Sequence, residues 1–290
     1  MHDPTRTGWE WLGPRAWFAD NHRYAHAGDS GRTGIGHVLL ALAMIALGIR
    51  GLFYGDFASV WQRIPIDTLP ARSFFVYACA LIEVAAGIGL LVRRSVPISS
   101  AVLFVYLLLW VVLLKLPAVV FVPQMEATWL GFGEIAVILA GGWVLYASRA
   151  GAWTRRHLAF AVGSNGVRWA RLLFVLALPM IGLSHFVYAT QTVGFVPAWI
   201  PSPYAWAYLT GAGSIATSLA LLLSIWPRLA ATLEAAMLSV ITLLVWLPGI
   251  FAAPGNDSVT PLLMSSAIAC GGWAVADSYR GTGWFGLPRT

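Results

Sequence analysis

Residues 96–116 read VPISSAVLFVYLLLWVVLLKL, a stretch whose one charged residue is Lys115. A helix rises about 1.5 Å per residue, so about 20 such residues cross the roughly 30 Å apolar core of a bilayer. A crossing segment must satisfy its own backbone hydrogen bonds, and a helix does so. The stretch therefore predicts a membrane-spanning helix.

Seven further stretches of the chain have the same character. The 290 residues are 59% hydrophobic and 10% charged, with a mean hydropathy of +0.74. Soluble chains are about 45–50% apolar and about 25% charged, because they must cover their surface with polar groups. We therefore expect an all-α polytopic protein in a lipid bilayer. The eight predicted spans are residues 35–53, 73–92, 96–116, 127–147, 172–190, 205–226, 229–251 and 260–276.

The basic residues predict the orientation of the chain. Lysine and arginine near span ends resist translocation and stay on the cytoplasmic side. If the N-terminus is cytoplasmic, 14 of the 18 lysines and arginines lie on that side. The exceptions are Arg50, Arg63, Arg72 and Lys115. We expect both termini in the cytoplasm. Because the basic residues lie in loops between apolar runs, the net charge of +6 does not indicate nucleic-acid binding.

The second half of the chain repeats the first. At an offset of 131, Leu116-Pro117 falls on Leu247-Pro248, and at 130 the Gly-Gly-Trp of residues 141–143 falls on residues 271–273. Each copy has four predicted helices, an even number, so both copies enter the membrane from the same side. We therefore expect two tandem four-helix bundles, side by side and in parallel orientation.

The repeat divides the chain into five parts. They are a cytoplasmic polar segment at 1–34, the first repeat at 35–148, a cytoplasmic basic linker at 149–168, the second repeat at 169–279 and a cytoplasmic tail at 280–290. The first of these parts is polar and carries four acidic residues, unlike the short basic start of a cleavable signal peptide. We expect the first apolar segment to remain as a helix.

Two stretches of the first repeat resemble a known family. Residues 52–57 (LFYGDF), followed by Trp61 and Pro65, and residues 81–91 (LIEVAAGIGLL) are similar to the DoxX-like integral membrane family. The second half is similar at 182–186 and 211–223, so the resemblance covers about residues 35–280 as a tandem member. It implies a four-helix fold of the bacterial inner membrane. Some members of this family are subunits of quinone-linked oxidoreductases.

Four ionisable residues fall inside the predicted spans of the first repeat. Arg50, Glu83, Lys115 and Glu134 each cost several kcal/mol at membrane depth, so each is a candidate catalytic residue. Their spacing predicts that they converge in the outer half of one bundle. The repeat offset places Ser184, Ser214, Trp246 and Ser265 at the equivalent positions, so we expect the first repeat to be the active one.

Three interpretations of this cluster are open. It can be two ion pairs that fix the helix register, because buried charges need one another. It can bind an anionic or quinone-like ligand, with Arg50 as donor and Glu83 as proton acceptor. It can relay protons during transport. Tyr54, Asp56 and Trp61 follow Arg50 into the outer loop and are candidate ligand-binding residues at its mouth, although Trp61 also fits an interfacial anchor.

The second repeat offers two isolated candidates. His185 lies deep in a span, is a further ligand-binding candidate, and is expected to form one hydrogen bond with a serine or a backbone group. Glu234 lies five residues into its predicted span, near the cytoplasmic face, and is expected to snorkel to the surface. Two cysteines cannot supply a disulfide framework or an iron–sulfur cluster, and we expect no metal site and no intrinsic cofactor.

These residues indicate the membrane component of a quinone-linked redox system. Because the sequence contains no flavin or metal motif, this hypothesis requires a partner protein that carries the redox centre. The alternatives are a small-solute or proton-linked transporter and a non-catalytic membrane assembly protein.

Overall fold

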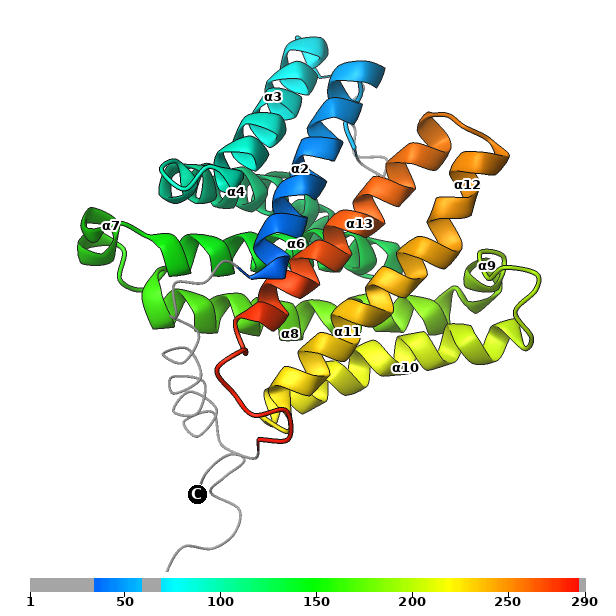
Figure 1. Cartoon of the computed structure of the whole chain (residues 1–290). Coiled ribbons are helices and arrows are strands. Elements are labelled where there is room, and N and C mark those ends of the chain that lie inside the picture. Colours follow the sequence, from blue (N-terminus) through cyan, green and yellow to red (C-terminus); the bar gives the residue numbers. More distant parts are fainter. Residues whose placement is uncertain (1–33, 59–68, 287–290) are drawn as a thin grey trace, which may run out of the picture.

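The computed structural model describes residues 34–58 and 69–286, and this part of the chain is helical without strands (Figure 1). Eight of its helices are long and apolar enough to cross a membrane. The prediction of an all-α polytopic membrane protein is confirmed. An even number of spans places residues 34 and 286 on the same side of the membrane.

Six spans are single helices and two are composite. The single helices are α2 (Ile35–Tyr54), α3 (Arg72–Leu91), α6 (Glu126–Arg149), α8 (Gly163–Val187), α10 (Pro203–Leu222) and α13 (Asn256–Asp277). The composite spans are α4 (Val96–Trp110), η2 (Val111–Lys115) and α5 (Leu116–Phe121), then α11 (Pro227–Ile241), η3 (Thr242–Trp246) and α12 (Leu247–Ala252). Short helices α7 (Ala152–His157) and α9 (Ala189–Val193) lie in loops.

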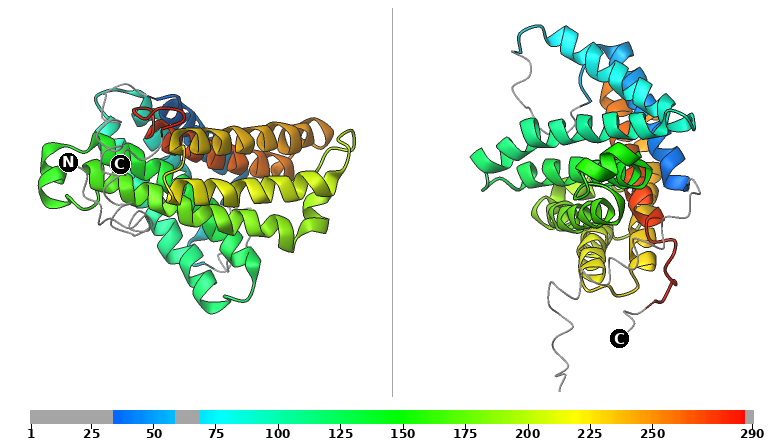
Figure 2. Two further views of the ribbon diagram at one scale, coloured as in Figure 1. Left: turned by 90° about the horizontal axis from the view of Figure 1, so that it is seen from below. Right: turned by 90° about the vertical axis from the view of Figure 1, so that its left-hand side faces the viewer.

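The eight spans form two groups of four that interlock. In the first group α2, α3, α4 and α6 pack in chain order, and in the second α8, α10, α11 and α13 do the same. The last helix of each group also packs on the first helix of the other, α6 on α8 and α13 on α2, and α6 packs on α13. Figure 2 shows the second group lying against α6. The two groups therefore share a central wall made of α6 and α13.

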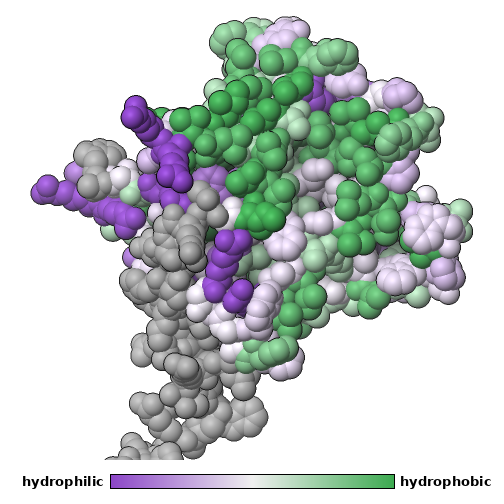
Figure 3. Space-filling model, viewed as in Figure 1, coloured by the Kyte–Doolittle hydropathy of each residue, from purple (hydrophilic) through white to green (hydrophobic). Residues whose placement is uncertain are grey.

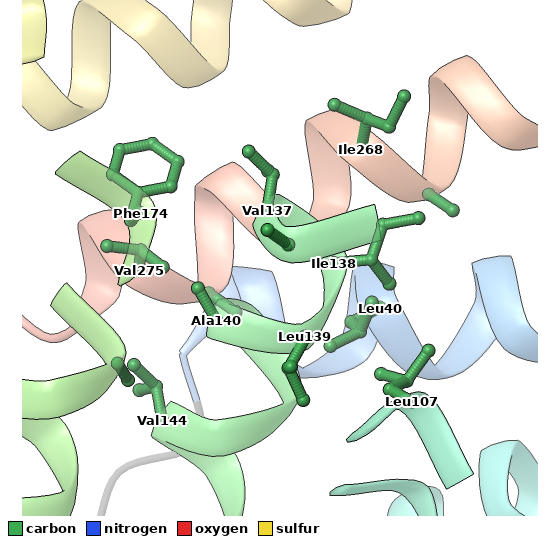
Figure 4. Close-up of a cluster of buried hydrophobic side chains, with 14 of the residues drawn as sticks. Leu40, Leu107, Val137, Ile138, Leu139, Ala140, Val144, Phe174, Ile268 and Val275 are labelled. Atoms are coloured by element: carbon green, nitrogen blue, oxygen red, sulfur yellow. The ribbon is translucent and has the colours of Figure 1, made fainter. Parts of the chain in front are cut away.

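The core lies along this wall. Buried side chains of α6 meet side chains from α2, α4, α8 and α13 in one cluster (Figure 4). Its members include Leu40, Leu107, Val137, Ile138, Leu139, Ala140, Val144, Phe174, Ile268 and Val275. Because α6 has neighbours on nearly every side, it is the most completely buried of the eight spans.

Glycines let the two central helices approach each other at the backbone. A Cβ atom on Gly141 would lie 2.7 Å from the Cα of Gly271, and one on Gly271 would lie 2.7 Å from the carbonyl oxygen of Val137. Small residues allow such close crossings in membranes, where dispersion contacts hold helices together. These two glycines are also equivalent by the repeat offset, so equivalent positions of the two halves meet at the centre.

The two composite spans share a backbone irregularity. Each contains one π-helical turn, η2 or η3, and all their bounds differ by 131 residues. A proline follows each turn after one intervening residue. Pro117 is the second residue of α5, and Pro248 is the second residue of α12. Proline lacks an N–H group and crowds the preceding turn, and a wider π-turn accommodates it. The offset found in the sequence therefore recurs in the backbone.

Polar and apolar residues are separated on the surface. The face over α2, α3 and α11–α13 is largely apolar, whereas hydrophilic side chains gather at the end from which α7 projects (Figure 3). Arg93 and Arg94 in the α3–α4 turn and Arg149 at the end of α6 belong to the side of the membrane that holds both ends of the described chain.

Gly141→Ala is expected to lower the free energy of unfolding by about 1–3 kcal/mol, because the added methyl group overlaps the α13 backbone, which cannot move independently. Gly142→Ala is the matched control. Its Cβ would meet the mobile end of Leu107 at 3.1 Å, so stability should change by less than about 1 kcal/mol. Thermal unfolding in detergent measures both, and equal effects would contradict a tight crossing at Gly141.

Candidate functional site

Arg50 joins the two groups of helices near the end of α2. Its guanidinium is buried and donates from Nε to Thr260 Oγ1 at 2.8 Å and from Nη2 to Asn256 Oδ1 at 2.6 Å. It also donates from Nη1 to the backbone oxygen of Asp56 at 2.6 Å. Thr260 and Asn256 lie in the first turns of α13, so Arg50 connects the end of α2 to the start of α13.

The residues that follow Arg50 at the end of α2 gather around it. The guanidinium lies 5.7 Å from the ring centre of Tyr54. The Asp56 carboxylate forms an ion pair at 2.5 Å with Arg72, and also accepts a hydrogen bond from the backbone N–H of Phe57 at 2.7 Å. Asp56 therefore contacts Arg50 through its backbone oxygen and neutralises Arg72 with its side chain. Trp61 lies outside the described residues.

Glu83 forms a pair with a phenol at mid-membrane. Its Oε1 accepts a hydrogen bond of 2.6 Å from the hydroxyl group of Tyr106 in α4. Glu83 lies eight residues before the end of α3, which is about 12 Å along the helix. Its side chain is partly exposed, while Tyr106 is buried. Arg50 is close enough to attract the Glu83 carboxylate electrostatically.

Lys115 and Glu134 form a second charged pair. Lys115 ends η2 and is buried, and it attracts Glu134 in the third turn of α6. Glu126, at the first residue of α6, repels Glu134, and within the described residues both of its carboxylate oxygens are buried without a hydrogen-bond partner. Of the four charges predicted for this site, Arg50 thus acts on Glu83 and Lys115 acts on Glu134.

The two candidates of the second group lie elsewhere. The Nδ1 atom of His185, near the end of α8, is 3.0 Å from the Thr210 hydroxyl oxygen of α10, and the backbone of Ala207 also interacts with this imidazole. The prediction that Glu234 snorkels is wrong. Its side chain is 1% exposed, because Ser214 of α10 supplies a hydrogen bond at 2.8 Å inside the helix interface.

Sequence reasoning missed Tyr106, Asn256 and Thr260. A single phenol inside the apolar stretch of residues 96–116 was a signal for Tyr106 as a polar partner at membrane depth. No comparable signal existed for Asn256 and Thr260, since they matter only because α13 packs against α2. Helix pairing between the two halves is not written in the composition of either helix.

The chain matches no family model, no curated protein and no solved structure. Within residues 34–58 and 69–286, no three side chains of His, Cys, Asp or Glu are grouped closely enough to hold a metal ion. The site is a set of proton donors and acceptors inside an apolar bundle. Such groups bind polar ligand atoms and exchange protons.

Arg50→Gln is expected to lower the free energy of unfolding by about 2–4 kcal/mol, because it removes charged hydrogen bonds that join α2 to α13. Arg93→Gln, an exposed arginine in the α3–α4 turn, serves as the control and should change stability by less than about 0.5 kcal/mol. Thermal unfolding in detergent compares them. An Arg50 variant as stable as the control would show that the connection contributes nothing.

Proposed function

We propose that this membrane protein is the membrane component of a quinone-linked redox system, with a quinone head group bound beside Glu83 and Tyr106. The observation that carries the proposal is the Glu83–Tyr106 pair at mid-membrane, in which a partly exposed glutamate accepts a hydrogen bond from a buried phenol. An ionisable group at this depth is costly, so its presence favours a functional role. The resemblance of residues 81–91 to DoxX-like proteins supports the same proposal.

Access from the lipid supports this site. Helix α3 lies at the edge of the bundle and packs on α2 and α4. Leu81 and Ile88 are exposed on the face of α3 opposite to Glu83 and would meet the acyl chains there, and Glu83 is itself partly exposed. A lipid-soluble molecule could therefore reach the Glu83 carboxyl sideways, without crossing the protein.

The side chains present fit a quinone head group. Reduction of a bound quinone would take up two electrons and two protons. Tyr106 can donate a hydrogen bond to a ligand carbonyl oxygen, and the Glu83 carboxyl can hold one of the two protons and release it to the same oxygen, while the second proton would come from water at the membrane surface. The positive charge of Arg50 would stabilise the carboxylate left behind. The electrons would come from a partner protein that carries a redox centre.

This proposal places the protein in a bacterial inner membrane with both termini in the cytoplasm. Support comes from Arg93, Arg94 and Arg149, which end or connect spans on the side that holds residues 34 and 286. Basic residues beside spans are typical of the cytoplasmic side. In this orientation a redox partner could dock on the cytoplasmic surface or on the opposite one.

Glu83→Gln and Tyr106→Phe are each expected to weaken quinone binding about tenfold or more, because each removes one member of the hydrogen-bonded pair. Quenching of tryptophan fluorescence by a short-chain ubiquinone and by a short-chain menaquinone measures binding to the purified protein. Tyr77 is an exposed tyrosine of α3, the helix that carries Glu83, and the Tyr77→Phe variant should bind quinone as the wild type does. A wild type that binds neither quinone, or two variants that bind normally, would refute the proposal.

A second candidate function is transport of a small solute or of protons. The observation that favours it is the pair of π-turns followed by Pro117 and Pro248 at equivalent positions of the two halves. Interrupted helices at matching positions of internal repeats are typical of transporter binding sites. Buried acids in such proteins carry protons.

If the protein conducts protons, the interior of proteoliposomes that contain a pH-sensitive dye should acidify faster than that of protein-free liposomes with the same dye under an imposed membrane potential. Glu83→Gln should return the acidification rate to that of protein-free liposomes, while Tyr77→Phe should not. A wild-type acidification rate equal to that of protein-free liposomes would refute proton transport. Absence of both quinone binding and proton flux would leave a non-catalytic assembly role.

A further inference from the structure

The second half of the molecule buries a carboxyl group of its own. Glu234 lies in α11, seven residues after the helix begins, which is about 10 Å along its axis. Its side chain is 1% exposed, and its Oε1 accepts a hydrogen bond of 2.8 Å from Ser214 Oγ in α10. The Thr217 hydroxyl, on the next turn of α10, also interacts with this carboxyl.

The other oxygen of this carboxyl has no partner. Glu234 Oε2 is buried and makes no hydrogen bond in the part of the chain that the structure describes. An ionised carboxylate in an apolar interior is costly without an opposite charge, and taking up a proton removes that cost. The geometry is that of a group that binds a proton.

Within residues 34–58 and 69–286, no charged neighbour replaces the proton. The spans packed against α11 are α10 and α13, and their titratable groups are Tyr204, Tyr208, Asp257, Cys270 and Asp277, with Arg228 on α11 itself. Asp277 is paired with Arg280, and Arg228 donates to the backbone oxygens of Arg280 and Thr282. The groups that act on Glu234 are the hydroxyls of Ser214 and Thr217.

Glu234 and Ser214 repeat the pair of Glu83 and Tyr106 with the roles of the two helices exchanged. The repeat offset of 131 places Ser214 at the position of Glu83, and Glu234 at the position of Leu103 in α4, one turn before Tyr106. In the first group the carboxyl is on the second helix and its hydroxyl partner on the third. In the second group the carboxyl is on the third helix and the hydroxyl on the second. Each group thus holds one carboxyl–hydroxyl pair across the same interface.

We propose that Glu234, Ser214 and Thr217 form a second membrane-embedded proton site, at which the Glu234 carboxyl takes up and releases a proton. On release, the carboxyl O–H bond breaks, the electron pair stays on the carboxylate, and the proton passes to water at the nearer membrane surface. Ser214 then donates to the charged oxygen. The site does not depend on quinone binding by the first half.

Infrared difference spectroscopy of the full chain in lipid nanodiscs tests the site. As the pH is raised from about 5 to about 10, a carbonyl band of a protonated carboxylic acid should disappear and a carboxylate band should appear. Glu234→Gln should remove one component of this change, because the buried acids of the first half contribute components of their own. Glu83→Gln, the matched variant of the first half, should leave the Glu234 component in place.

Ser214→Ala assigns the Glu234 carbonyl band even if the Glu234→Gln variant does not fold. Loss of the hydrogen bond to the carbonyl oxygen should move the Glu234 band to higher frequency, whereas Thr210→Val, at a hydroxyl that contacts His185, should not move it. A Glu234 band that persists unchanged over the whole pH range would overturn the proposal, since the carboxyl would then be permanently protonated. A spectrum identical in wild type, Glu234→Gln and Ser214→Ala would also overturn it.

Discussion

The close contact between the backbones of α6 and α13 at Gly141 and Gly271 determines how the rest of the molecule is arranged. Side chains larger than hydrogen at these positions would push the two central helices apart. At this short distance each central helix can reach the first helix of the other group, so α6 packs on α8 and α13 packs on α2. The two halves then share one core and cannot separate as two independent bundles.

The interlocked arrangement joins α2 to α13 at both ends. At the end of α2 and the start of α13, Arg50 donates to Asn256 and Thr260. At the opposite end, the Asp277 carboxylate accepts a hydrogen bond of 2.7 Å from the backbone N–H of Gly36 in the first turn of α2. Such an acceptor also interacts favourably with the positive end of the helix dipole. Polar contacts therefore fix the register that apolar packing alone leaves open.

The sequence predicted the spans well because apolar length is a property of one segment. The last span shows the limit: it was predicted at residues 260–276 and extends over Asn256–Asp277. The polar residues at its start weaken the hydropathy signal, and those residues include two partners of Arg50. The charges at Arg50, Glu83, Lys115 and Glu134 were found from the cost of burying them. Their division into two pairs, and the burial of Glu234, depend on helix pairing, which no single segment encodes.

Comparing the two halves position by position hides what they share. At the position of Glu83 the second half has Ser214, so an alignment indicates that the acid is lost. The structure shows an acid on the facing helix, Glu234, that accepts a hydrogen bond from this serine. A carboxyl group needs a donor across an interface, and either helix of the interface can supply either member. The feature that recurs in both halves is therefore the pair of facing helices with one acid and one hydroxyl between them. A search for functional positions in this fold should compare interfaces between helices, because the acid itself has changed helix.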